Sequence, residues 1–141
     1  MPFQNPSDAV IKSLLTPPKL IAMVGASDKP DRASNRVMAF LLSKGFDVVP
    51  VNPQLAGKMI HGKTVVKDLA SVGRPIDMVD IFRASEFVAP IVDEAIALHA
   101  KSVWMQLGVI DEKAAAKAQA AGLTVVMDRC PAIEWPSLRL G

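Results

Sequence analysis

The sequence predicts an α/β fold in which helices cover both faces of a five-stranded parallel sheet. Five short apolar runs alternate with segments of helical periodicity, and no internal repeat or linker interrupts this alternation. Such a pattern is typical of a doubly wound, Rossmann-like sheet whose strands are joined by right-handed crossovers. With 141 residues, of which 50% are hydrophobic, the chain is expected to form one domain over residues 1–141.

The first strand is expected at Leu20–Val24, a run of apolar residues that ends at Gly25. A run this short fits a strand buried on both faces better than a helix. The small residues Gly25, Ala26 and Ser27 then form a loop, and a helix is expected over 34–44. A strand, a small-residue turn and a helix N-terminus leave backbone N–H groups unpaired at the positive end of a helix dipole. This combination predicts a site for a phosphorylated ligand.

The remaining elements follow from apolar spacing and from the residues that cap or stop them. Further helices are expected over 7–15, about 67–72, from Ser85 onward and over 111–122, and further strands over 47–51, 77–81, 102–106 and 123–127. Pro50 donates no backbone hydrogen bond, so it is expected near a strand end or a bulge. Residues 52–63 are expected to form an irregular loop.

The expected order of the five strands is 3-2-1-4-5, counted along the chain. In this order the direction of the connections reverses between strands one and four, and ligands of doubly wound sheets lie at such a reversal. The ligand is therefore expected above the carboxyl ends of strands one and four.

The charge and the apolar runs exclude several classes of partner. The net charge is +2 and the basic residues are spread along the chain, which argues against nucleic acid. The longest apolar runs are shorter than the roughly 18 residues of a membrane span, and residues 1–6 do not resemble a secretory signal. Cys130 is the only cysteine, which favours a reducing, cytoplasmic location. His61 and His99 have no other ligand at metal-binding spacing, so no metal site is expected.

Nucleotide fingerprints are incomplete. The dinucleotide pattern needs three glycines after the first strand and an acid at the end of the second. Only Gly25 is present after the first strand, and Asn52 and Pro53 follow the second. The P-loop pattern is missing. A small NAD- or nucleotide-dependent oxidoreductase or transferase stays open as an alternative.

Several motifs along the chain resemble one family. They are Gly25-Ala-Ser, Val51-Asn-Pro, Asp80-Ile-Phe-Arg, Trp104-Met-Gln-Leu-Gly and Met127-Asp-Arg-Cys-Pro. Together they are similar to the small bacterial CoA-binding proteins, which are stand-alone relatives of the CoA-binding domain of the succinyl-CoA synthetase alpha subunit. The resemblance extends from Leu20 to Glu134 and implies coenzyme A, or an acyl-CoA, as the ligand.

The resemblance also implies roles for individual residues. The loop at Gly25, Ala26 and Ser27 and the start of the next helix would hold the pyrophosphate, with Ser34 and Arg36 in reach of it. Val51, Asn52 and Pro53 would line the nucleotide side, and Ile81, Phe82 and Arg83 would lie against adenine and pantetheine. Gln106 and Gly108 would occupy the segment that carries a glutamate in the synthetases.

Two departures from the synthetases favour binding without catalysis. Gln106 cannot act as an acid or a base, and 141 residues leave no room for the second domain, which bears the phosphorylated histidine. A hydrophobic content of 50% is compatible with a homodimer or an unidentified protein partner.

Simpler interpretations stay open beside these roles. Ser34 or Asn35 could be only a helix N-cap, and Arg36 only a solvated charge. Arg83 could form a surface ion pair with Glu86, and Phe82 could belong to the core. Cys130 could be a buried apolar residue, a thiol near the pantetheine end or a nucleophile, in that order of preference.

Overall fold

The main sheet and its two helical layers confirm the expected fold class. The structure is a computed structural model that describes residues 3–138; the ends of the expected domain, residues 1–2 and 139–141, lie outside the described residues. The main sheet contains β1 (Leu20–Val24), β2 (Asp47–Val51), β5 (Met78–Ile81), β6 (Ser102–Met105) and β7 (Thr124–Val126), all paired in parallel.

The order of these strands is β2-β1-β5-β6-β7, which corrects the expected order. Counted along the chain it is 2-1-3-4-5, so the direction of the connections reverses between β1 and β5. Both orders satisfy parallel pairing and right-handed crossovers, so the alternation of elements alone cannot separate them. Pro50 could have indicated the correct order. It lies in β2, which is an edge strand of the main sheet, where a residue without an N–H is tolerated.

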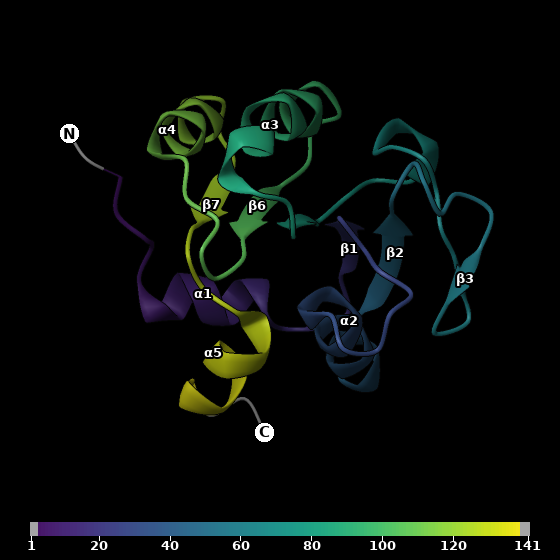
Figure 1. Ribbon diagram of the computed structural model, residues 1–141. Coiled ribbons are helices and arrows are strands. Elements are labelled where there is room, and N and C mark those ends of the chain that lie inside the picture. Colours follow the sequence, from purple (N-terminus) through teal and green to yellow (C-terminus); the bar gives the residue numbers. More distant parts are fainter. Residues whose placement is uncertain (1–2, 139–141) are drawn as a thin grey trace.

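Two helical layers enclose the sheet (Figure 1). On one face lie α3 (Val88–Ala97) and α4 (Glu112–Ala120), and on the other lie α1 (Asp8–Leu14), α2 (Ala33–Ser43) and α5 (Pro131–Ser137). Side chains alternate between the faces along each strand, as strand geometry requires. In β1, Ala22 packs in the α3–α4 core cluster, whereas Ile21 and Met23 pack in the cluster shared with α1, α2 and α5.

Several elements differ in detail from the sequence expectation. The loop over 52–63 contains the strands β3 (Met59–Ile60) and β4 (Lys63–Thr64), which pair antiparallel. The short helix near 67–72 is a 3₁₀ turn, η1 (Ala70–Val72), and a second turn, η2 (Ser85–Phe87), precedes α3. The segment after the fifth strand forms α5, with Pro131 at its start, a position that proline favours.

No helix within residues 3–138 is both long and apolar enough to span a membrane.

Candidate functional site

The loops that follow β1, β2 and β5 meet at Gly25. The Gly25 N–H donates to the Val51 carbonyl oxygen at 3.0 Å, and the Phe82 N–H donates to the Val24 carbonyl oxygen at 2.8 Å. Gly25 has φ +87°, and a Cβ at this residue would lie 2.6 Å from the Phe82 carbonyl oxygen. Only glycine combines this backbone conformation with so close an approach. The three loops are therefore held together where β1 and β5 end.

Asparagine side chains fix the loop after β1. The Asn52 amide donates to the Ala26 carbonyl oxygen at 2.9 Å, and the Asn35 amide donates to the Ser27 carbonyl oxygen at 2.9 Å. We call Gly25, Asn52 and Phe82, one residue from each loop, the loop junction. The Gly25 N–H, the Phe82 N–H and the Asn52 amide are all paired within the protein, which defines the shape of the junction before any ligand binds.

The start of α2 is open to an anion. The helix begins at Ala33, and its N-cap, Arg32, makes no side-chain capping hydrogen bond. Among the hydrogen bonds of residues 3–138, none uses the N–H groups of Ala33 and Ser34. Unpaired N–H groups at a helix N-terminus attract anions through hydrogen bonding and the helix dipole. The structure thus corrects one interpretation, because the N-cap is Arg32 and neither Ser34 nor Asn35.

Two cavities flank the loop junction. The first has a volume of about 370 Å³ and the second about 350 Å³. Gly25 and Asn52 line both, so the cavities adjoin at the junction. Besides these two, the first is lined by Val24, Val51, Pro53, Gln54, Lys67, Asp68, Leu69, Arg83, Ile91 and Glu94. The second is lined by Ala26, Ser27, Lys29, Arg32, Ala33, Ser34 and Phe82.

Most of the site residues expected from the sequence therefore come together around the junction. Gly25, Val51, Asn52, Pro53 and Arg83 line the first cavity, and Gly25, Ala26, Ser27, Ser34, Asn52 and Phe82 line the second. The position of the cavities differs from the expected one. They lie by β1 and β5, whereas the ligand was expected by strands one and four, which are β1 and β6. This follows from the corrected strand order.

Four expected residues line neither cavity. Ile81 is fully buried in β5. The Arg36 guanidinium turns back and donates to the Asp31 carbonyl oxygen at 2.6 Å. Gln106 and Gly108 lie in the segment after β6, where the Gly108 N–H donates to the Asp128 carboxylate at 2.7 Å.

Arg83 has a different neighbour from the one expected. Its guanidinium carbon lies 4.4 Å from the centroid of the Phe87 ring, a stacked cation–π arrangement. No ion pair joins Arg83 to Glu86 in the part of the chain that the structure describes.

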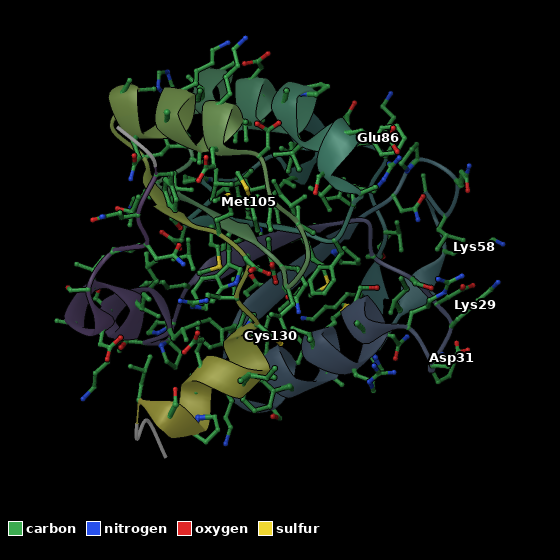
Figure 2. The ribbon with its side chains drawn as sticks, turned by 60° about the vertical axis from the view of Figure 1, so that its left-hand side comes forward. Lys29, Asp31, Lys58, Glu86, Met105 and Cys130 are labelled. Carbon is green, nitrogen blue, oxygen red and sulfur yellow. The ribbon has the colours of Figure 1, made fainter. Side chains whose placement is uncertain are left out.

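Sequence reasoning missed several charged residues of the cavities. Lys29 and Arg32 precede α2 by only a few residues, so their closeness to Ser34 could have indicated them. Figure 2 shows Lys29 at one end of the molecule, away from Cys130. Lys67 and Glu94 come from segments distant from the β1 loop in sequence, and no local pattern could have placed them in the first cavity.

A second polar group of residues lies inside the protein, on the α1–α2–α5 face. Asp80 in β5 is paired in register with Trp104 in β6, and Gln106 follows Trp104 by two residues. We call Asp80 and Gln106 the buried pair, because they are 0% and 7% exposed. Both Asp80 carboxylate oxygens and the Gln106 Oε1 have no hydrogen-bond partner among the described residues. Burial raises the pKa of the Asp80 carboxyl to about 8.

Cys130 lies in the core on the α1–α2–α5 face of the sheet. It is 7% exposed and belongs to the same core cluster as Trp104. The indole Nε1 of Trp104 donates to the carbonyl oxygen of Arg129, the residue before Cys130, at 2.9 Å. The burial of Cys130 agrees with the first of the three interpretations, a buried apolar residue.

Residues 3–138 contain no cluster of three or more histidine, cysteine, aspartate or glutamate side chains that could hold a metal ion.

Two relatives match nearly the whole of the chain. The uncharacterized protein YneT from Bacillus subtilis (strain 168) is 39% identical over 128 residues, which cover 91% of this chain and 93% of the relative. A hypothetical protein from Pyrococcus horikoshii OT3 is 38% identical, with a TM-score of 0.91, and the match covers 100% of this chain and 97% of that chain.

A more distant similarity shows the fold alone. It is to the dinucleotide forming Acetyl-coenzyme A synthetase 1 of Ca. Korarchaeum cryptofilum, with 24% identity and a TM-score of 0.68, over 81% of this chain and 26% of that chain. The family described as CoA binding domain matches residues 19–136, which include every strand of the main sheet and both cavities. The chain belongs to the CoA binding domain family.

Proposed function

We propose that the protein binds coenzyme A, or an acyl-CoA, at the carboxyl edge of the sheet over β1 and β5, and that it does not transform this ligand. The observation that carries the proposal is the loop junction beside the uncapped start of α2. Coenzyme A has a pyrophosphate and a 3′-phosphate, so it needs hydrogen-bond donors and cations. The second cavity supplies both, through the N–H groups of Ala33 and Ser34 and the side chains of Lys29 and Arg32.

The pyrophosphate would lie in this second cavity, against Ser27 and the first turn of α2. The nucleoside would then enter the first cavity, which adjoins at Gly25 and Asn52 and offers apolar groups on Val51 and Ile91. Arg83 stands at the first cavity, where a guanidinium can pair with a phosphate or stack on a purine.

The pantetheine arm would extend toward the segment after β6. This segment is held beside the turn after β5, because the Ile110 N–H donates to Ser85 Oγ at 2.9 Å. Gln106 stands where the synthetases carry a glutamate, and an amide performs no acid–base chemistry at neutral pH. This supports binding rather than turnover.

Thermal unfolding with different ligands tests the proposal. A ligand that binds only the native state stabilises it by about 2.7 kcal/mol at a hundred times its Kd. We expect coenzyme A to raise the unfolding midpoint clearly, and NAD at the same concentration to leave it unchanged. A larger shift with NAD would contradict the proposal and favour the oxidoreductase alternative, in which the same cavities hold a dinucleotide.

A further inference from the structure

The carboxylate of Glu94 lines the first cavity, although a negative charge there would repel an anionic ligand. Glu94 projects from α3 and is half-buried. Its Oε1 accepts the Leu69 N–H at 2.8 Å, which fixes the side chain against the turn before η1. Within residues 3–138, no hydrogen bond or ion pair engages its second oxygen, Oε2. Oε2 is not fully buried, so a ligand in the cavity can reach it.

The neighbouring charges do not explain this arrangement. Lys67 and Arg83 line the same cavity, yet neither forms an ion pair with Glu94. Asp68, also in the cavity lining, accepts both the Ser71 N–H, at 2.9 Å, and the Ser71 hydroxyl, at 2.6 Å, on Oδ1, so its Oδ2 also has no partner within residues 3–138. The two residues differ in how they are held: Asp68 bonds within its own turn, whereas Glu94 bonds to a segment 25 residues away. Glu94 thus offers the cavity one free acceptor on a side chain fixed between two segments.

A free carboxylate oxygen repels phosphate and accepts hydrogen bonds from neutral donors. The parts of a nucleotide that carry such donors are the amine of the base and the hydroxyl of the ribose. Because the cavity also has apolar groups at Val51, Leu69 and Ile91, it suits a nucleoside better than a phosphate.

We propose that Glu94 determines which nucleoside the protein accepts, by taking a hydrogen bond from the adenine amine or the ribose 2′-hydroxyl through Oε2. This inference rests on the proposed function and names the specificity residue of that site. Charge-assisted hydrogen bonds in a partly buried site are among the stronger ones, and an analogue that lacks the donor leaves the carboxylate unpaired.

Selectivity between matched ligands tests the inference. The probes are adenosine 3′,5′-bisphosphate, its purine riboside counterpart, in which hydrogen replaces the amine, and its 2′-deoxy counterpart. We expect wild-type protein to bind one of the two analogues roughly ten- to a hundredfold more weakly than the parent, as for one charge-assisted hydrogen bond. The analogue that loses affinity identifies the donor as the amine or the hydroxyl.

The variant Glu94→Gln keeps the shape of the side chain and a carbonyl oxygen for Leu69, but it removes the charge and places an amide donor at the cavity. In calorimetric titrations of this variant, the preference for adenosine 3′,5′-bisphosphate over the weaker-binding analogue should fall to threefold or less. The control is Glu112→Gln, an exposed glutamate at the start of α4 that lines neither cavity, and it should keep the wild-type preference.

The possible failures are distinguishable. If wild-type protein binds neither coenzyme A nor adenosine 3′,5′-bisphosphate, the proposed function is wrong, and this inference with it. If both bind but Glu94→Gln keeps the full preference, or wild-type protein shows none, the inference about Glu94 alone is overturned and its role is to hold Leu69.

Discussion

The loop junction and the buried pair are both polar and both lie near the carboxyl ends of the central strands, but they differ in how their polar atoms are paired. At the junction, Gly25 and Asn52 use their polar groups to join loops to each other. In the buried pair, Asp80 and Gln106 carry oxygens with no partner among the described residues.

This difference separates two physical costs. A paired junction stabilises one loop conformation, so a change there costs stability and distorts the binding edge. An unpaired buried carboxylate costs free energy in the native state, and it lowers this cost by staying protonated. Changes at the two regions should therefore affect unfolding in opposite ways.

The largest effect is expected from Gly25→Ala. The new Cβ would lie 2.6 Å from the Phe82 carbonyl oxygen at a residue with φ +87°. Backbone strain and overlap together should reduce the free energy of unfolding by roughly 3–5 kcal/mol. Gly57→Ala is a matched control, because Gly57 also has φ +87° but nothing within 4 Å of an added Cβ. It should cost only about 1 kcal/mol of strain. Equal losses in urea titrations would mean that the contact with Phe82 does not matter.

The next largest effect concerns Asp80 and pH. The pKa of Asp80 is about 8 in the native state, whereas the ordinary aspartate value of 3.8 applies in the unfolded state. Between these two pH values the native state therefore binds one more proton than the unfolded state. The Asp80 contribution to stability is therefore fully present below about pH 4 and is lost as pH rises toward 8, with a slope of up to about 1.4 kcal/mol per pH unit.

Asp80→Asn should remove this decline, so the variant gains on the wild type as pH rises from 5 to 8. Asp93→Asn serves as control, because Asp93 is exposed and paired with Lys117 at 2.6 Å. Urea unfolding at several pH values measures both. A pH dependence of stability that Asp80→Asn shares with the wild type would show that Asp80 is charged in the native protein.

A smaller effect is expected from Arg83→Ala, this time on binding. Loss of the guanidinium at the first cavity should weaken coenzyme A binding by about 1–3 kcal/mol, the range for a hydrogen bond to a charged group. Stability should change little, because Arg83 forms no ion pair within the described residues. Arg74→Ala, which removes an exposed ion pair with Asp47, should leave the affinity unchanged. Equal calorimetric affinities for the wild type and Arg83→Ala would restrict Arg83 to its contact with Phe87.

The smallest effect is expected from Cys130→Ala. A buried thiol in the core cluster should contribute packing and little to the affinity for coenzyme A. Mass spectrometry after incubation with oxidised coenzyme A should show no adduct on native wild-type protein. A reversible adduct of one coenzyme A mass, missing in the variant, would instead support a thiol at the pantetheine end.

The local pattern of the sequence determined the five strands of the main sheet, its longer helices and the main loop of the candidate site. Leu20–Val24 is apolar throughout and ends at a glycine, and the structure has β1 over the same residues, buried on both faces. The sequence also placed Asn52 and Phe82 at the candidate site. Both follow buried strands, and they meet at the junction because parallel strands end at one edge of the sheet. These features depend on residues close together in the chain, so composition and periodicity reveal them.

Only the tertiary structure decided which strands are neighbours and which distant side chains enter the cavities. The pairing of β1 with β5, which the sequence pattern did not predict, moved the point of reversal and the site with it. Lys67 and Glu94 reach the first cavity, whereas Arg36 turns toward Asp31. Each outcome depends on contacts between segments far apart in sequence, or on the choice of a side-chain rotamer. Neither leaves a periodic signal, because the energies involved arise only after the sheet has assembled.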